Sequence, residues 1–201
     1  MIRTYFNGKA PVWDVTAAEM DEIKLRTMAA RLDMNPGVTV LDVGSGTGIF
    51  IPFLLERIGA GGKLVALDIA EEMLKKARAK GFNGVTAYLN ADVGCIPLAD
   101  GIFDDVVCYS SFPHFQDKML ALTEIYRVLK DGGRLSICHT SSRVHINGIH
   151  CAIPEVCRDI LPGDGEMEAL LAEAGFTGIQ IEDNCENYFC CARKAASLRK
   201  V

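Results

Sequence analysis

The sequence predicts an α/β fold in which a mostly parallel sheet finishes with an antiparallel hairpin. Short apolar runs, which we expect to be strands, alternate with segments whose apolar residues recur at helical spacing. Most of these runs lack the polar alternation of a half-exposed strand, which is typical of parallel strands covered by helices on both faces. The last two runs, 176–182 and 188–193, are joined only by a polar turn, as in a hairpin.

The N-terminal part is expected to be a lead-in followed by one helix. Residues 1–15 are aromatic and irregular, which favours a segment that packs on the body as a cap or lid. Thr16 and Glu19 form a capping-box pattern, which opens a helix. The candidate core positions of this helix are Met20, Ile23, Met28 and Leu32. We therefore divide the chain into an N-terminal lid and helix, residues 1–35, and a main domain, residues 36–201.

The main domain is expected to contain seven strands and four helices. Runs of aliphatic and β-branched residues predict strands at 38–43, 63–68, 85–89, 103–110, 134–139, 176–182 and 188–193. Helical spacing, with glycines after several of the segments, predicts helices at 49–58, 70–80, 118–129 and 166–174. The stretch 140–162 is polar and without a regular pattern, so we expect it to be irregular.

Composition and charge exclude several classes of partner. The net charge is −5 and no basic block exceeds Lys75-Lys76, so a nucleic-acid partner is not expected. No apolar run reaches the roughly 18 residues that span a bilayer, and the start lacks a signal-peptide pattern. None of the eight cysteines forms a CxxC pair, so a disulfide framework is not expected either. We expect a cytoplasmic protein without a membrane span.

A glycine loop follows the first strand of the main domain. Glycines 44, 46 and 48 allow a tight turn and leave no Cβ between the main chain and a ligand. Their spacing does not fit the GxGxxG pattern of dinucleotide-binding proteins. Asp42 stands two residues before the first glycine, where it would repel a pyrophosphate and attract a cation such as an α-amino group.

Two further acids end neighbouring strands. Asp68 closes the second strand, where a carboxylate accepts hydrogen bonds from ribose hydroxyls. Asp92 lies just past the third strand and can accept from an adenine amino group. Three acids at one sheet edge, with no basic residue beside the glycines, predict a nucleoside ligand that carries an amine and no phosphate.

With these motifs the chain resembles the class I S-adenosylmethionine-dependent methyltransferases. FPHF at 112–115 and the histidine-bearing stretch 139–150 look familiar from relatives of their quinone-methylating group. The resemblance is carried by LDVGSGTG at 41–48, ALDIAEEML at 66–74, NADVGCIPLADGIFDDV at 90–106 and RVLKDGGRL at 127–135. It implies a Rossmann-like three-layer sandwich, with a seven-stranded sheet whose last strand is inserted antiparallel. It also implies S-adenosyl-L-methionine as methyl donor and S-adenosyl-L-homocysteine as product.

The resemblance further implies roles for individual residues. Asp42 and the glycine-loop backbone meet the methionine moiety, and Asp68 takes the ribose hydroxyls. Ile69 packs on the adenine, while Asp92 and the Val93 N–H meet its edge. Tyr109 and Ser110, which follow the fourth strand, line the passage between donor and acceptor. The full set is Asp42, Gly44, Ser45, Gly46, Gly48, Asp68, Ile69, Asp92, Val93, Tyr109 and Ser110.

All four histidines lie between positions 114 and 150. His114 follows the fourth strand and His139 ends the fifth, so both are expected at the carboxyl edge of the sheet beside the donor. Three interpretations stay open: a neutral histidine takes a proton from the nucleophile, two or three histidines hold a metal, or these are polar residues with structural hydrogen bonds. The candidate catalytic residues are His114, His139, His150, Arg143 and Tyr109.

We therefore expect an S-adenosylmethionine-dependent methyltransferase that acts on a small molecule by in-line methyl transfer. The fourth strand is not followed by the Asn/Asp-Pro-Pro-Tyr motif of amino-methylating DNA enzymes, which agrees with a small-molecule acceptor. The alternatives are a non-catalytic nucleoside-binding or metal-sensing module and an NAD-dependent oxidoreductase. The sequence specifies neither the acceptor nor the oligomeric state.

Overall fold

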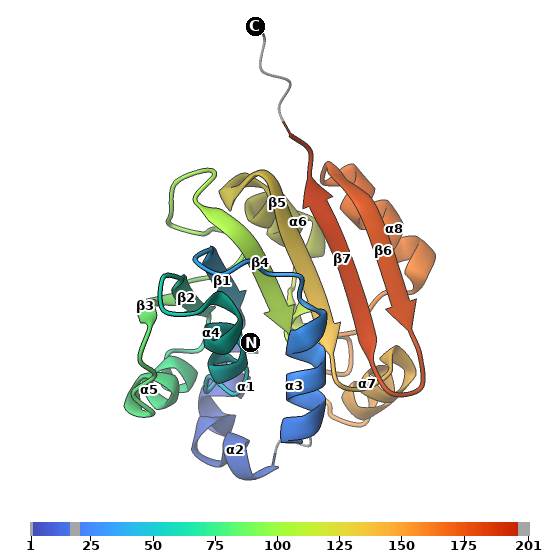
Figure 1. The fold of residues 1–201 in the computed structure, drawn as a ribbon. Coiled ribbons are helices and arrows are strands. Elements are labelled where there is room, and N and C mark those ends of the chain that lie inside the picture. The colour runs from blue at the N-terminus through green and yellow to red at the C-terminus, as the bar shows by residue number, and fades with distance from the viewer. Residues whose placement is uncertain (1, 17–20, 197–201) are drawn as a thin grey trace, which may run out of the picture.

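A central sheet organises the chain in the computed structural model, which describes residues 2–16 and 21–196. Within these residues the sheet has seven strands, in the order β3-β2-β1-β4-β5-β7-β6 (Figure 1). Their bounds are β1 (Thr39–Val43), β2 (Lys63–Asp68), β3 (Val85–Asn90), β4 (Phe103–Tyr109), β5 (Leu129–His139), β6 (Phe176–Asp183) and β7 (Tyr188–Lys194). The first five pair in parallel, and β7 lies antiparallel between β5 and β6. The predicted fold class, with its inserted antiparallel last strand, is confirmed.

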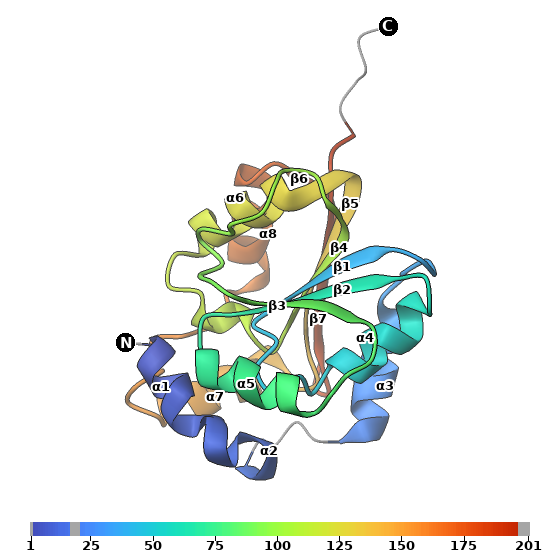
Figure 2. The same cartoon turned by 90° about the vertical axis from the view of Figure 1, so that its left-hand side faces the viewer.

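Helices cover both faces of the sheet (Figure 2). One face carries α3 (Glu22–Arg31), α4 (Ile51–Ile58) and α5 (Glu71–Ala79), and the other carries α6 (Lys118–Val128) and α8 (Asp164–Glu173). The remaining segments gather near the carboxyl ends of the parallel strands (Figure 1): α1 (Ile2–Lys9), η1 (Ala10–Val12), α2 (Trp13–Thr16), η2 (Phe112–His114) and α7 (Arg143–Cys151). Among the described helices, none is both long and apolar enough to cross a membrane.

The strands contribute side chains to two separate cores. In β1, Val40 packs with the side chains of α3 and α4, whereas Leu41 and Val43 pack with those of α6. All three are fully buried. A strand covered on both faces has no side that faces water, which explains why β1 has apolar side chains on both faces instead of alternating apolar and polar ones.

The N-terminal prediction is wrong in two places. Ile2–Lys9 form helix α1, although the sequence pattern there indicates irregular structure. Helix α3 begins at Glu22 rather than after Thr16, because Asp21 is the residue that caps it. The Asp21 carboxylate accepts two backbone N–H groups of the first turn, at 3.0 and 3.2 Å. The other predicted members of the N-terminal part of this helix, Glu19 and Met20, lie outside the described residues.

Two further expectations are corrected by the burial pattern. Ile23 is 77% exposed, because it lies opposite the buried stripe of α3. That stripe consists of Leu25, Met28, Ala29 and Leu32. The stretch 140–162 contains helix α7, which begins where the Ser142 hydroxyl accepts the backbone N–H of His145. Because Ile146 is its one buried residue, α7 has no apolar stripe that a sequence pattern would detect.

Candidate functional site

A cavity lies over the glycine loop at the carboxyl ends of β1, β2 and β4. It encloses about 950 Å³, its open mouth included. Ten of the eleven residues predicted for the donor site line it, and these are Asp42, Gly44, Ser45, Gly46, Asp68, Ile69, Asp92, Val93, Tyr109 and Ser110. Residues far apart in the sequence therefore meet at one place.

Two of the loop glycines are required by close packing. Gly44 has φ +72°, and a Cβ there would lie 2.3 Å from the Cβ of Ser111. The Ser111 hydroxyl donates to the Val43 carbonyl at 2.6 Å, so the end of β4 is held directly against the loop. Gly48, which does not line the cavity, has φ +82°, and a Cβ there would lie 2.6 Å from the Phe82 ring. Packing against Phe82 therefore accounts for the glycine at position 48.

Asp68 joins the glycine loop to the end of β2. Its Oδ2 accepts the Gly46 N–H at 2.8 Å, and its Oδ1 accepts the Ala70 N–H at 2.7 Å. Burial raises the pKa of this carboxyl, while the two backbone N–H groups act to lower it. Each carboxylate oxygen can accept a second hydrogen bond, so Asp68 keeps acceptor capacity for a ligand hydroxyl.

Asp42 is buried beside Asp68 without a cation. The residue is 1% exposed, and its Oδ2 is buried with no hydrogen-bond partner in the protein. Burial, and then the neighbouring Asp68 charge, raises the pKa of Asp42 to about 7. Because an unpaired buried carboxylate is costly, this position favours a positively charged ligand group.

Unpaired polar atoms are concentrated at this cavity. Among the described residues, six buried side-chain nitrogen or oxygen atoms have no hydrogen-bond partner. Three of them, Asp42 Oδ2, Ser45 Oγ and Ser110 Oγ, belong to cavity-lining residues. Ser110 also adopts φ +51°, which is uncommon for a residue other than glycine. Since folded proteins rarely leave buried polar groups unpaired, the cavity fits a polar ligand.

Asp92 and Val93 lie on the loop between β3 and β4, at positions 91–102. The Asp92 Oδ1 accepts the Gly94 N–H at 2.9 Å, while Val93 is buried. Ile69, at the end of β2, is half-buried and lines the same cavity. An apolar surface beside a carboxylate suits a flat heterocycle that carries an amino group.

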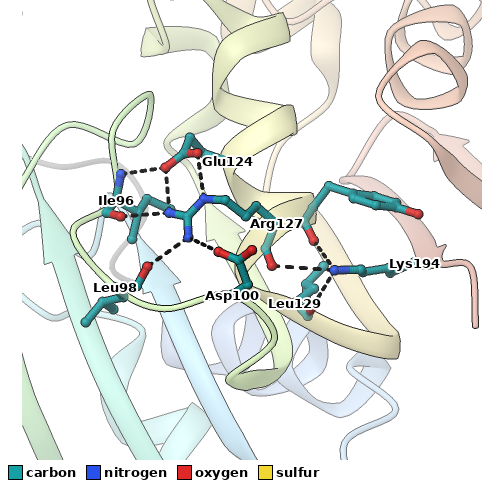
Figure 3. Close-up of polar contacts among 8 residues, drawn as sticks. Ile96, Leu98, Asp100, Glu124, Arg127, Leu129 and Lys194 are labelled. Carbon is teal, nitrogen blue, oxygen red and sulfur yellow. Dashed lines mark hydrogen bonds and ion pairs between the residues drawn. The ribbon is translucent and has the colours of Figure 1, made fainter. Parts of the chain in front are cut away.

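The loop 91–102 is fastened to α6 by Arg127 (Figure 3). The guanidinium donates to the Ile96 and Leu98 carbonyls, each at 2.8 Å, and pairs with Glu124 at 2.8 Å and Asp100 at 2.7 Å. This role of Arg127 was not predicted from the sequence, although the residue stands in the RVLKDGGRL motif at 127–135. Its contacts hold the loop that presents Asp92.

His114, on η2, also lines the cavity. Its Nδ1 lies 2.9 Å from Asp159 Oδ2. Its ring meets the Phe6 ring edge-on at 4.9 Å between centroids and packs against the His150 ring at 4.7 Å. The structure therefore brings together two of the predicted histidines. It adds Asp159, which was not predicted from the sequence because this residue lies in an irregular segment 45 positions away.

The other two histidine candidates stay outside the cavity lining. His150 is held by a hydrogen bond from its Nδ1 to the Asp159 backbone carbonyl. His139 is 2% exposed, and its Nε2 has no partner. Burial lowers the pKa of His139 to about 3, and the nearby His114 and His150 act in the same direction. His139 is therefore neutral at physiological pH and is a weak base.

Of the two remaining catalytic candidates, Tyr109 lines the cavity and Arg143 does not. Tyr109 lines the cavity, stacks on Phe50 at 4.3 Å between ring centroids, and has its hydroxyl 3.0 Å from that of Thr140. Arg143 does not line the cavity. Its Nε pairs with Asp183 at 2.9 Å, which joins the start of α7 to the end of β6. This ion pair gives Arg143 a structural role, so its presence needs no catalytic explanation.

No group of three or more His, Cys, Asp or Glu side chains is arranged to hold a metal ion anywhere in the part of the chain that the structure describes. The metal interpretation of the histidines therefore gains no support.

The N-terminal helices form one wall of the cavity. Ile2, Phe6 and Trp13 line it, and Phe6 meets Trp13 edge-on at 5.6 Å between ring centroids. Helix α2 is fixed to the body by Asp14, which accepts from the Thr47 hydroxyl and pairs with Lys80 at 2.9 Å.

Fold and cavity together define an α/β protein with a polar cavity at the carboxyl ends of its parallel strands. Comparison with known proteins shows which proteins it resembles. Residues 41–137 match the family model described as a methyltransferase domain. The ubiquinone/menaquinone biosynthesis C-methyltransferase UbiE of Klebsiella pneumoniae is 35% identical over 137 residues, which cover 66% of this chain and 54% of that enzyme. The chain thus spans about half the length of the curated relatives it matches.

Solved structures agree in fold. One of them is a Haloferax volcanii methyltransferase, solved in complex with the Trm112 methyltransferase activator. It aligns with a TM-score of 0.77, at 21% identity over 94% of this chain and 97% of that one. A Haemonchus contortus phosphoethanolamine N-methyltransferase, solved with phosphomonomethylethanolamine and S-adenosylhomocysteine, aligns with a TM-score of 0.69, at 18% identity over 87% and 53%. In sequence and in fold the chain is similar to the class I S-adenosylmethionine-dependent methyltransferases. The curated relatives that it matches in sequence include quinone-methylating enzymes.

Proposed function

We propose that this protein transfers a methyl group from S-adenosylmethionine to a small molecule. The observation that carries the proposal is the buried Asp42 oxygen without a partner, in a cavity that also holds two unpaired serine hydroxyls. Methionine's ammonium group is a cation of the kind that an unpaired carboxylate would bind. Phosphate-bearing cofactors such as NAD would bring negative charge toward Asp42 and Asp68, so the oxidoreductase alternative is not favoured.

Within this proposal the donor occupies the cavity from the glycine loop to the loop 91–102. Asp42 and the backbone of residues 44–47 hold the methionine part, and Asp68 accepts from the ribose hydroxyls. Ile69 and Val93 pack around the adenine, and Asp92 accepts from its amino group. The bound donor supplies an electrophilic methyl group, and the protein's contribution is to hold it in line with the acceptor.

The acceptor is placed on the side of the cavity formed by Tyr109, Ser110 and His114. Phe6 meets His114 on this side, and Phe6 and Trp13 pack with Ala70 and Met73 at the start of α5. We propose that residues 2–16 act as a lid that excludes water from the transfer. An apolar wall of this kind suits a small organic molecule, and the net charge of −5 disfavours a nucleic acid. Eight free thiols in the described chain support the cytoplasm as its location.

Titration with S-adenosylhomocysteine tests the proposal directly. We expect binding to change the fluorescence of Trp13, which is the single tryptophan and lines the cavity. Asp68→Ala should weaken binding by about 2–4 kcal/mol, because two ribose hydroxyls lose a charged acceptor. Asp33→Ala is the control, since it removes a carboxylate that is 85% exposed and precedes β1, at the strand's opposite end.

The outcomes separate the candidate functions. Tight binding of NADH without binding of S-adenosylhomocysteine would overturn the methyltransferase proposal. Binding of S-adenosylhomocysteine without turnover on any acceptor would favour the non-catalytic nucleoside-binding module. Equal affinity of Asp68→Ala and Asp33→Ala would show that Asp68 does not contact the ligand.

A further inference from the structure

We propose that Asp159 is a positioning residue that prepares His114 to remove a proton from the methyl acceptor. The acceptor is accordingly a compound whose nucleophilic atom carries a proton until it is bound. This inference rests on the proposed function and deepens it by naming the chemical class of the acceptor.

Asp159 is held on several sides although it lies in a segment without regular structure. The residue is 8% exposed. Its Oδ2 meets His114 Nδ1 at 2.9 Å, its Oδ1 accepts from Gln116 Nε2 at 3.4 Å, and its backbone carbonyl accepts from His150 Nδ1. The two contacts of the carboxylate and the one contact of the backbone together fix the orientation of Asp159 toward the imidazole.

The contact determines which nitrogen of His114 is available. An ionised carboxylate only accepts hydrogen bonds, so the hydrogen of a neutral His114 lies on Nδ1. The Nε2 atom then carries a lone pair, and His114 lines the cavity. The Phe6 ring, edge-on at 4.9 Å, limits rotation of the imidazole. Nε2 is therefore positioned to accept a proton from a molecule in the cavity.

The neighbouring histidines are less suited to this task. A backbone carbonyl only accepts, so the hydrogen of neutral His150 lies on Nδ1, and burial lowers the pKa of this imidazole. Burial lowers the pKa of His139 to about 3, and neither residue lines the cavity. Charged or titratable groups that interact electrostatically with His114 or Asp159 include Asp68, Lys118, His139 and His150.

The proposed proton and methyl transfers conserve atoms and charge. His114 Nε2 takes the proton from the acceptor X–H, and the electron pair left on X forms the bond to the methyl carbon. The carbon–sulfur bond of the donor breaks with its electron pair staying on sulfur, so the sulfonium becomes a neutral thioether. Asp159 pairs with the imidazolium until His114 releases the proton to water after the product leaves.

The tautomer of His114 gives a test that needs no acceptor. The chain has four histidines, so long-range ¹H–¹⁵N spectra of histidine-labelled protein with S-adenosylhomocysteine bound are readily assigned with single variants. We expect neutral His114 to carry its hydrogen on Nδ1 in the wild type and in Asp164→Asn. We expect Nε2–H to become populated in Asp159→Asn. A wild-type His114 with its hydrogen on Nε2 would overturn the proposal.

Kinetics test the role in proton removal with two probe acceptors. Catechol is neutral at pH 7.5, whereas 4-nitrothiophenol is already a thiolate there. Asp159→Asn and His114→Gln should each lower kcat on catechol by about 100-fold, yet change the rate on the thiolate by only about threefold or less. Asp159→Glu should recover part of the loss, and Asp164→Asn, which removes an exposed acid near Arg143, should behave as wild type.

Equal losses of kcat on both acceptors, or no loss on catechol, would overturn the proposal. A residue with a merely structural role would affect the neutral and the already ionised acceptor alike. In wild-type protein that binds S-adenosylhomocysteine, a lack of turnover on both probes counts against methyl transfer itself. The tautomer of His114 then decides by itself whether the His114–Asp159 pair is formed.

Discussion

The Asp42 carboxyl group sits at the end of β1 with no partner for one of its oxygens. Its pKa in the folded protein is about 7, above its ordinary value of 3.8, because burial disfavours the charged form. An acid whose pKa is raised by folding binds a proton more tightly in the folded state than in the unfolded state. Stability is therefore lost as the pH rises from about 4 to about 7, by up to about 4 kcal/mol.

Replacing this one residue should separate stability from binding. Asp42→Asn should raise the free energy of unfolding of the ligand-free protein at pH 8, and raise it much less at pH 4.5, because the variant has no carboxylate to bury. The same change should weaken binding of S-adenosylhomocysteine by about 2 kcal/mol or more, since the ammonium group loses its charged partner. Urea unfolding at the two pH values and calorimetric titration measure these effects.

The two effects have opposite signs, which makes the test specific. A variant that is merely misfolded would lose both stability and affinity. Full affinity in the Asp42→Asn variant would show that the carboxylate does not contact the ligand's cation. Functional sites commonly keep residues that lower stability, and Asp42 fits this pattern.

At the scale of elements, the loop 91–102 depends on a helix that does not touch the cavity. Arg127 of α6 binds two carbonyls of this loop, and Lys194 of β7 donates nearby to the Tyr126 and Leu129 carbonyls, each at 2.8 Å (Figure 3). Both cations thus stabilise the same region. Arg127 orders the binding loop, whereas Lys194 satisfies carbonyls at the end of α6.

This difference yields a paired prediction. Arg127→Met should weaken binding of S-adenosylhomocysteine by about 1–2 kcal/mol, because the loop must then be ordered when the ligand binds. Lys194→Met should lower the melting temperature while leaving the affinity unchanged. Calorimetric titration and thermal unfolding of both variants check this. If both variants lost affinity equally, the effect would be one of general stability and not of the loop.

Elements with a strong apolar pattern were predictable, and those without one were not. Apart from β3, which has no fully buried residue, the strands and α4, α5, α6 and α8 bury apolar residues, and most of their bounds agree with the prediction to within two residues. The exception is β5, which begins at Leu129 instead of Arg134. By contrast, α1 buries none of its residues fully and α7 buries only Ile146. These two helices are stabilised by contacts with the rest of the molecule, which a local pattern does not record.

The same distinction holds at the site. The acids at the strand ends follow from the order of strands, so Asp42, Asp68 and Asp92 were predictable from the sequence. Asp159 and Arg127 act through contacts between distant segments and left little local signal. Their roles become visible only when the whole chain is folded.

At the scale of the whole molecule, buried ionisable groups of opposite type act on stability together. His139 is neutral in the folded protein because burial lowers its pKa to about 3, below its ordinary value of 6.5. The unfolded chain therefore binds more protons than the folded chain at this residue. Its contribution to stability is lost as the pH falls from about 6.5 toward 3, whereas that of Asp42 is lost as the pH rises from about 4 to 7.

Between pH 4 and 6.5, a rise in pH increases the free energy of unfolding through His139 and decreases it through Asp42. The free energy of unfolding of the wild type therefore reveals neither effect by itself. His139→Gln should remove one of them. The free energy of unfolding of this variant, relative to wild type, should then rise by about 1.4 kcal/mol for each unit of pH below 6.5. Urea unfolding at pH 7.5, 6 and 5 measures the difference, with His145→Gln on the exposed face of α7 as the control. A difference that does not change with pH would mean that His139 binds a proton as readily in the folded protein as in the unfolded chain, which contradicts its lowered pKa.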